Sequence, residues 1–300
     1  MLDLLPFHRS IKGLSDLLPY SRLVAEGVVA NKDGSLTAAW EFKGSDTASS
    51  TMGELDFVAA QANQAVLLLG TGWMLHIDAV RRPATAYPAP ARSHFPDIVS
   101  QLIDEERRAF FNRATCFEVT TLLTLTYKPE RSLAANLLTD RKTEAEILKE
   151  FQAALDNFEN ILSGVLKMSR LGEYRLEDSA GLPRLYSALL AHLQHCLTGD
   201  FQPVRVPEPC AMYLDGIIGS QDFIGGLEPR LGEKYLAILS IDGFPQDSYP
   251  AILELLSGLP LSYRFSTRFI CLDQTGRPQD GGGLPQDLGA ADVQPERQVF

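Results

Sequence analysis

The stretch Gly232–Asp273 constrains the fold more than any other part of this 300-residue sequence. It opens with a near-continuous apolar run, Tyr235–Ile241, which is too short for an ordinary helix and is typical of a strand buried on both faces. A short leucine-rich helix is predicted around Pro250, and a second strand is predicted over Leu261–Leu272. A strand, a helix and a second strand make a βαβ crossover. We therefore predict an α/β protein whose main sheet contains both strands.

The rest of the chain predicts a mixed sheet with packed helices. Two β-prone runs, Leu23–Ala30 and Ser35–Lys43, are joined by Asn31-Lys-Asp-Gly34, and Asp-Gly is typical of a tight hairpin. The other predicted elements are a capped helix from Thr51 to about Leu69, strands Trp73–Val80 and Phe117–Tyr127, helices Asp97–Arg113, Thr143–Leu171 and Leu182–Leu197, and a short hairpin over Met212–Ile224. The fold class is thus a mixed β-sheet with an N-terminal hairpin, packed helices and a C-terminal βαβ unit.

The chain divides into three parts. Residues 1–20 hold two leucine-rich clusters, which we interpret either as a lead-in segment packing on the domain or as an amphipathic segment docking on a membrane partner. Residues 21–273 form the α/β domain, which a loop near 130–142 could subdivide. Residues 274–300 are rich in Gly and Pro and have almost no apolar periodicity, which predicts a disordered tail.

The composition argues against several classes of protein. A net charge of −11 and a pI near 5.0 disfavour a surface that follows nucleic-acid phosphates. No apolar run approaches the ~20 residues that a membrane-spanning helix needs, and Asp3 and Pro6 interrupt the N-terminus where a signal peptide would be apolar. The four cysteines are widely spaced and fit free thiols. We expect a cytoplasmic protein that does not bind nucleic acid directly.

No motif predicts a catalytic or cofactor-binding residue. A P-loop requires G-x-x-x-x-G-K-[ST], and the nearest string, Gly226–Lys234, has the wrong spacing and precedes a predicted strand instead of following one. Gly70-Thr-Gly72 lacks the third glycine of a dinucleotide fingerprint. The sequence also contains no G-x-S-x-G nucleophile motif. We therefore expect no catalytic residues and no cofactor in this chain.

Four side chains have the donor types of a zinc site. His192, His195 and Cys196 fall within about one turn of a predicted helix, and Cys210 is the fourth candidate. Their spacing matches no standard zinc site. We therefore interpret them as packed or partly exposed side chains and expect no metal.

Two further polar sets lie on predicted strands. Arg264 and Arg268 share one strand face and could bind an anion, although solvated or ion-paired side chains are the simpler interpretation. His76 alternates onto one face with Asp78, and we interpret His76 as structural.

The C-terminal stretch also resembles a known family. It reads LSIDGFPQDSYPAILELLSGLPLSYRFSTRFICLD, in which a strand ends in Gly-Phe-Pro and a later Tyr-Arg…Arg-Phe strand closes on Leu-Asp. The N-terminal hairpin followed by Gly44-Ser-Asp46, and a Gly-Trp…Arg pattern around Trp73, extend the likeness. Over roughly Leu17–Asp273 the sequence resembles the amino-terminal half of the CagE/TrbE/VirB ATPases, the motor subunits of conjugation and type IV secretion machines.

The resemblance implies a docking role for this chain. Family members bind ATP and magnesium in a carboxy-terminal motor with Walker motifs, and no residue here corresponds to those motifs. The implied partners are inner-membrane type IV secretion subunits, other secretion ATPases and further copies of the chain, at the cytoplasmic side of the bacterial inner membrane. The alternative is a small-molecule α/β enzyme with a cleft at the carboxyl ends of its strands, near Asp242 and Asp273.

The tail departs from the family pattern after Asp273. Read one base forward with permissible codons, Asp280–Val293 gives TAEAYRKTWAQQTF, a helix-prone string similar to the family's continuation. We therefore hypothesise a single-base frameshift between about Asp273 and Asp280, which truncates the subunit before its Walker motifs. The encoding DNA tests this: a shifted frame that soon meets a stop codon, or that never reaches a Walker A motif, overturns the hypothesis.

Overall fold

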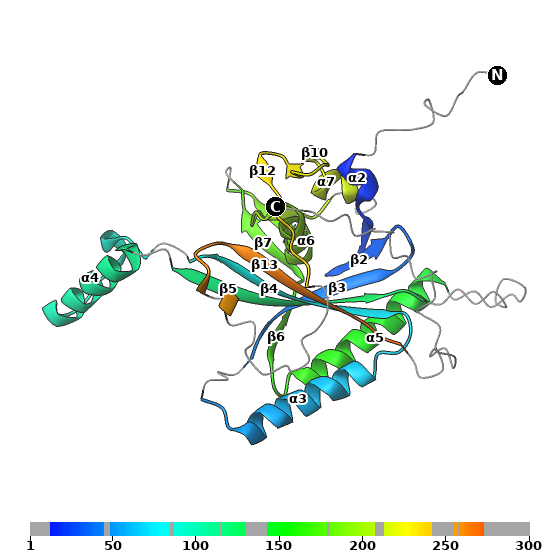
Figure 1. Ribbon diagram of the computed structural model, residues 1–300, viewed down its shortest axis with the longest axis horizontal. Helices are drawn as coiled ribbons and strands as arrows, with labels where there is room; N and C mark the ends of the chain where they lie inside the picture. The colour runs from blue at the N-terminus through cyan, green and yellow to red at the C-terminus, as the bar shows by residue number, and fades with distance from the viewer. Residues whose placement is uncertain are drawn as a thin grey trace, which may run out of the picture.

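A computed structural model of the chain describes residues 13–44, 49–84, 87–113, 116–129, 143–178, 181–207, 213–241, 255–256 and 258–272. The body is a seven-stranded antiparallel sheet with two helices on one face and a helix with two small sheets on the other (Figure 1). The main strands follow the order β1-β2-β3-β5-β4-β13, and β6 also pairs with β3. This mixture of helices and sheets confirms the predicted α/β class.

The chain enters the sheet through two consecutive hairpins. They are built from β1 (Tyr20–Ala25), β2 (Val28–Asn31) and β3 (Leu36–Lys43). The predicted tight turn at Asn31–Gly34 is confirmed, and Gly34 takes a φ of 85° that favours glycine. The prediction of a single strand over Leu23–Ala30 is wrong, because a turn at Gly27, with φ of 64°, divides it into β1 and β2.

Longer strands form the centre and the opposite edge of the sheet. They are β4 (Trp73–Pro83), β5 (Phe117–Tyr127) and β13 (Tyr263–Ile270), with the short β6 (Lys167–Arg170) pairing to β3. β5 lies between β3 and β4, which confirms the predicted central strand. β13 pairs with β4 over all of its eight residues, from Tyr263 opposite Arg81 to Ile270 opposite Met74.

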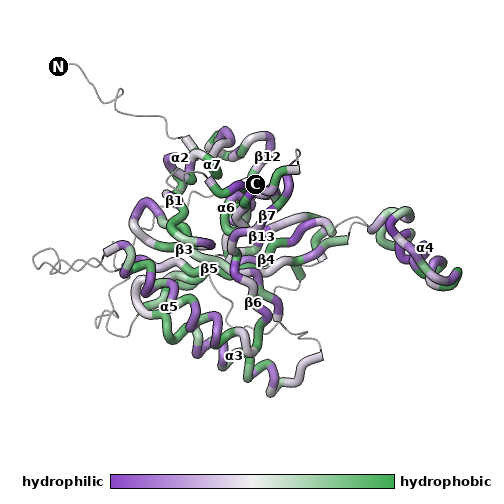
Figure 2. Tube along the Cα trace, turned by 180° about the vertical axis from the view of Figure 1, so that it is seen from behind, coloured by the Kyte–Doolittle hydropathy of each residue, from purple (hydrophilic) through white to green (hydrophobic). Residues whose placement is uncertain are grey.

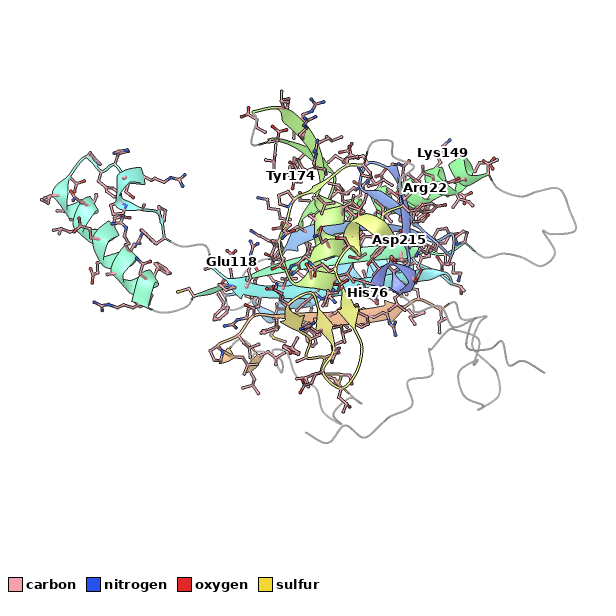
Figure 3. All side chains as sticks on the ribbon, turned by 90° about the horizontal axis from the view of Figure 1, so that it is seen from above. Arg22, His76, Glu118, Lys149, Tyr174 and Asp215 are labelled. Atoms are coloured by element: carbon pink, nitrogen blue, oxygen red, sulfur yellow. The ribbon has the colours of Figure 1, made fainter. Side chains whose placement is uncertain are left out.

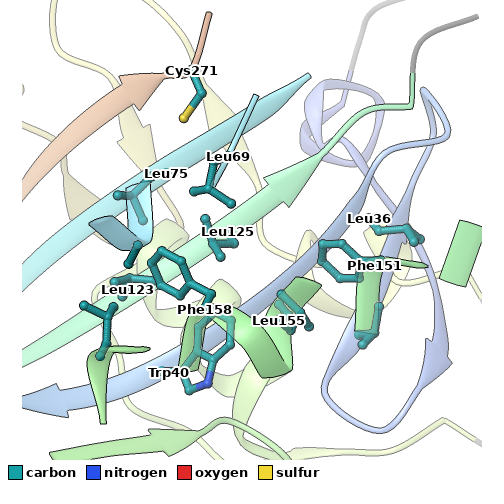
Figure 4. Packing of buried hydrophobic residues seen from close by; sticks show 14 residues of the cluster. Leu36, Trp40, Leu69, Leu75, Leu123, Leu125, Phe151, Leu155, Phe158 and Cys271 are labelled. Atoms are coloured by element: carbon teal, nitrogen blue, oxygen red, sulfur yellow. The ribbon is translucent and has the colours of Figure 1, made fainter. Parts of the chain in front are cut away.

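The larger core lies between the sheet and two helices, α3 (Met52–Leu67) and α5 (Glu144–Leu162). Each helix begins with a capping box, Thr51 with Glu54 and Thr143 with Glu146, in which the threonine side chain and the glutamate satisfy each other's free amides. The core side chains on this face include Leu36, Trp40, Leu75, Leu123, Leu125, Phe151, Leu155, Phe158 and Leu162 (Figure 4).

The end of α5 differs from the prediction. The sequence predicts a helix that continues to Leu171, but α5 ends at Leu162 and residues 163–166 turn the chain back toward the sheet. The next four residues form β6, in which Arg170 lies opposite Trp40 of β3. The pairing of Lys167–Arg170 with the sheet therefore replaces the last predicted helical turns.

The second face of the sheet carries smaller elements. They are α2 (Leu14–Leu17), β7 (Glu173–Glu177), β8 (Pro183–Ser187), α6 (Ala188–Thr198), β9 (Val204–Arg205), α7 (Asp215–Ile218), β10 (Phe223–Ile224), β11 (Arg230–Leu231) and β12 (Lys234–Tyr235). Leu18 is buried in the core beneath these elements. Residues 1–12 lie outside the described residues.

Two local predictions on this face are wrong. The expected hairpin over Met212–Ile224 is instead the short helix α7 followed by β10, and β10 pairs with β11. The helix predicted from Leu182 begins only at Ala188, because Pro183–Ser187 pairs with β7 as a strand.

The predicted βαβ unit is also wrong in its first strand. Within Tyr235–Ile241 only Tyr235 belongs to a strand, β12, which pairs with β11 in a separate small sheet. Ile238 is 83% exposed. The neighbour of β4 on this side is β13, and it is antiparallel, so no parallel pair exists among these described strands for a crossover to join. Most of the predicted connecting helix lies outside the described residues.

Candidate functional site

The most unusual side-chain environment lies between the main sheet and α6. Strand alternation places Asp78 of β4 on the face toward α6, whereas Leu75 and Ile77 face the larger core. His192 and Cys196 are four residues apart on α6 and therefore share the helix face that meets the sheet. Asp78 is 3% exposed and His192 is 5% exposed. We call Asp78, His192 and Cys196, together with the exposed Arg264 beside Asp78, the buried polar cluster.

The buried polar cluster is close-packed but poorly hydrogen-bonded. His192 Nε2 lies 4.0 Å from Asp78 Oδ2, and Cys196 Sγ lies 3.7 Å from His192 Nδ1. The nearest cation to Asp78 Oδ1 is Arg264 Nη1 on β13, at 3.6 Å. Asp78 Oδ1 is buried and accepts no hydrogen bond from any described residue. A buried carboxylate is thus held by one long ion pair.

Burial governs the protonation of the cluster. It lowers the pKa of His192 to about 4, with the negative charge of Asp78 acting in the opposite direction. It also raises the pKa of Cys196 to about 11. Near neutral pH the imidazole and the thiol are therefore both uncharged.

The structure brings together two of the four zinc candidates predicted from the sequence. His192 and Cys196 meet, whereas the ring of His195 stacks on Phe201 at a centroid distance of 3.8 Å. Cys210 lies outside the described residues. Asp78 was not among the zinc candidates, although the same strand alternation that paired it with His76 predicts its face.

The two arginines of β13 lie on the face predicted for them. Arg264 pairs with Asp78, which supports the ion-paired interpretation for this residue. Arg268 is opposite His76 in the strand register and is exposed. The sequence analysis missed the contact between Arg264 and Asp78. The two residues are nearly two hundred positions apart, and only the pairing of β13 with β4 brings them together.

The residues closest to a P-loop string do not fit a phosphate group. Gly226–Lys234 forms β11 and the turn into β12, with Gly232 at φ of 56°, and β12 rather than a helix follows the turn. Lys234 Nζ donates to the Thr198 carbonyl at 3.2 Å and to Asp200 Oδ1. No nucleotide chemistry follows from this segment.

An open hollow of about 740 Å³ lies on the small sheet of β7, β8 and β9. Its basic lining residues are Arg175, Arg184 and Arg205. Arg184 is paired with Asp178 at 2.9 Å. Asp242 and Asp273, near which the sequence predicts an enzyme cleft, lie outside the described residues.

A second candidate surface is helix α4 (Ile98–Arg113), which stands apart from the body (Figures 1 and 2). It lies in an insertion between β4 and β5, which pair up to Pro83 and Phe117. The Ala84 N–H donates to the Cys116 carbonyl at 2.7 Å and closes the base of this arm. Figure 3 shows Glu118, the ion-pair partner of Arg82, on the side of the body from which the arm extends.

One side of α4 is held within the arm and another is exposed. The Tyr87 hydroxyl donates to Asp104 at 2.6 Å, and the guanidinium of Arg108 donates to the Pro88 carbonyl and to Asp104. These contacts orient the helix. Phe111 is also exposed but stacks on the Tyr87 ring, and the other exposed apolar side chains are Ile98, Val99, Leu102, Ile103 and Phe110, which we call the arm surface. No helix among the described residues is long and apolar enough to cross a membrane.

Comparison with known proteins gives the family. A family model for the N-terminal domain of the type IV secretion system ATPase VirB4/TrbE matches residues 27–134, which run from β2 to beyond β5 and include the arm. The chain is 37% identical over 285 residues to conjugal transfer protein TrbE of Rhizobium radiobacter, covering 91% of this chain and 34% of that protein. The chain thus spans about a third of the length of this relative.

Two proteins of Sinorhizobium fredii also match the chain. One is described as the first portion of a probable conjugal transfer protein TrbE; it is 44% identical over 133 residues, covering 44% of this chain and 89% of that protein. The other is described as the second portion; it is 37% identical over 125 residues, covering 41% of this chain and 18% of that protein. The chain therefore belongs to the VirB4/TrbE family of type IV secretion system ATPases, and it corresponds to the N-terminal region of a conjugal transfer protein TrbE.

Proposed function

We propose that this chain is the docking half of a conjugal transfer ATPase subunit. In this role it attaches the motor to inner-membrane components of the secretion channel and takes no part in ATP hydrolysis. The relatives supply the context, because the matching proteins are named as conjugal transfer components. The single observation that carries the docking role is the arm surface.

The arm surface suits a protein partner with an apolar helix. Its five exposed side chains are aliphatic or aromatic, and they lie on a helix that projects from the body. Exposed apolar groups of this size are typical of interaction sites, and amphipathic helices bind through such a face. The arm also carries Arg107 and Arg113 together with Glu105 and Glu106, so no net basic charge favours a direct lipid contact. We infer an inner-membrane subunit with an apolar cytoplasmic or juxtamembrane helix as the partner.

Membrane flotation tests the docking role. The chain is expressed with and without the inner-membrane subunits of a conjugation system, and the membranes are floated on a density gradient. We expect the chain to float only when those subunits are present. Leu102→Asp should abolish flotation, because it places a charge in the middle of the arm surface.

The matched control is Leu176→Asp, which alters an exposed leucine of β7 outside the arm. It should float as the parent does. Flotation that ignores the inner-membrane subunits, or that Leu102→Asp leaves intact, contradicts the proposal.

A further inference from the structure

We propose that Asp78, His192 and Cys196 form a binding site for a divalent metal ion of the zinc class, and that Arg264 is the counter-ion of Asp78 when the metal is absent. The proposal concerns the interior of the domain and is independent of the docking role. Its basis is the convergence of three different donor atoms in one buried place, all within 4.8 Å of one another.

The three donors match the ligand chemistry of zinc. Carboxylate oxygen, imidazole nitrogen and thiolate sulfur are its usual protein ligands, at about 2.0–2.3 Å. Tetrahedral ligands at those bond lengths are separated by roughly 3.3–3.7 Å. His192 Nε2 is 3.8 Å from the Cys196 sulfur and 4.0 Å from Asp78 Oδ2. Small side-chain rotations bring all three to a common ion.

The local fold presents these donors from two rigid elements. His192 and Cys196 are one helical turn apart on α6, an arrangement that directs both side chains to the same side. Asp78 faces them from β4, a strand paired on both sides by β5 and β13. Metal sites on helices and strands are better positioned than sites on loops. The backbone therefore need not move for an ion to bind.

Asp78 supplies a second, independent observation. Its Oδ1 atom is buried and accepts no hydrogen bond from the described residues. Leaving a buried charged acceptor without a hydrogen bond is costly, and such groups call for a structural explanation. A metal ion bound by both oxygens of the carboxylate would satisfy Oδ1 as well as Oδ2. On binding, Cys196 becomes a thiolate and its proton passes to solvent.

Arg264 competes with a metal ion for Asp78, so it contacts the carboxylate only when the metal is absent. Its guanidinium is 3.6 Å from Asp78 Oδ1, so it neutralises the carboxylate without a close hydrogen bond there. A divalent ion at the same place would repel it. Arg264 is on the edge strand β13 and is itself exposed, so the side chain can turn outward. Metal and guanidinium are thus alternative cations for one carboxylate, with Tyr20 and Thr124 as the polar neighbours.

Cobalt(II) titration of the whole purified chain, after removal of metals with EDTA, tests the proposal. We expect one Co²⁺ per chain, the visible absorption of a four-coordinate site and a near-ultraviolet sulfur-to-cobalt charge-transfer band. Zn²⁺ should displace the cobalt, and the visible absorption and the charge-transfer band should then both disappear. Cys196→Ser should remove the charge-transfer band, and Cys271→Ser, at a cysteine outside the cluster, should keep it.

The decisive variant is Arg264→Met, which removes the competing cation and preserves an apolar stem. It should bind Co²⁺ about tenfold more tightly or better, since the guanidinium that lies 3.6 Å from Asp78 Oδ1 and competes for the carboxylate is lost. Arg268→Met, on the same face of the same strand, should bind as the parent does. A charge-transfer band that survives Cys196→Ser overturns the proposal, as does the absence of cobalt binding in both the parent and folded Arg264→Met.

Discussion

Single residues decide the stability of the larger core. Phe158 of α5 is 2% exposed and lies 6.0 Å, centroid to centroid, from the ring of Trp40. The Trp40 Nε1–H donates to Glu159 at 2.9 Å, and Arg170 also binds Glu159, so α5, β3 and β6 are joined at this point. Packing and hydrogen bonding therefore coincide on one helical turn of α5.

Phe158→Ala should destabilise the protein by about 3–5 kcal/mol, because it leaves a cavity that the sheet and α5 cannot close. Chemical denaturation monitored by circular dichroism measures the change. Phe110→Ala is the control, since Phe110 on the arm is 66% exposed and should change the stability by less than about 0.5 kcal/mol. Equal losses in the two variants would place Phe158 outside the core.

His192 makes the metal-free protein sensitive to acid. Its pKa is about 4 in the folded chain, against an ordinary value of 6.5, so between those values the unfolded chain binds the proton and the folded chain does not. The stabilisation is present above pH 6.5 and is lost as the pH falls toward 4. Burial lowers the pKa values of His76 and His195 in the same direction.

We therefore expect the stability of the parent, measured in EDTA, to fall more steeply between pH 6.5 and 4 than that of His192→Gln, whose side chain does not titrate. Urea denaturation at successive pH values gives both curves. Parallel curves would mean that His192 is already protonated in the folded protein.

At the scale of elements, local sequence signals predicted structure well where the chemistry is local. The capping box at Thr51 and the Asp-Gly turn each satisfy their own backbone groups, so they need no distant partner. The boundary of α5 failed because β6 gains its hydrogen bonds from β3, more than a hundred residues earlier. Pairing over such a distance leaves no mark in a local pattern.

Long-range pairing also explains why only part of the buried polar cluster could be predicted from the sequence. Sequence reasoning found His192 and Cys196 because they are one helical turn apart, but it could not place Asp78 or Arg264 against them. It also predicted a helix over Asp97–Arg113, without showing that the apolar side of α4 has little to pack against. Which face of an element is covered depends on the tertiary structure.

The segment after β12 gives an element-scale prediction. An apolar run alone predicts a buried strand, but residues 236–241 form no strand and Ile238 is exposed. Ile238→Asp should change the free energy of unfolding by no more than about 0.5 kcal/mol. Leu125→Asp, in the fully buried centre of β5, should cost more than about 4 kcal/mol or prevent folding. Thermal melting of both variants checks this, and a large loss in Ile238→Asp would restore the buried strand.

At the scale of the whole molecule, we predict that the chain neither binds nor hydrolyses ATP. The sequence lacks a P-loop, and the string closest to one forms a hairpin whose lysine is bound to Asp200. Calorimetry with ATP and magnesium should show no binding, and a phosphate-release assay should show no turnover. Magnesium-dependent turnover that persists through further purification would contradict the prediction.

The packed body and the projecting arm lie in separate parts of the molecule. The sheet and its two cores form a compact body, while the arm inserted between β4 and β5 projects from that body (Figure 1). An insertion between paired strands can present a surface without disturbing the sheet. The account therefore predicts that contact with the secretion channel is made through the arm.

Site-specific photo-crosslinking tests this claim most directly. A photoreactive amino acid is placed at Leu102 on the arm, or at Leu176 on β7, in cells that assemble a complete conjugation system. Irradiation should join the Leu102 probe to an inner-membrane subunit of the channel, and the Leu176 probe should give no such product. Crosslinks from Leu176 but none from Leu102 would contradict the account, because docking would then occur away from the arm.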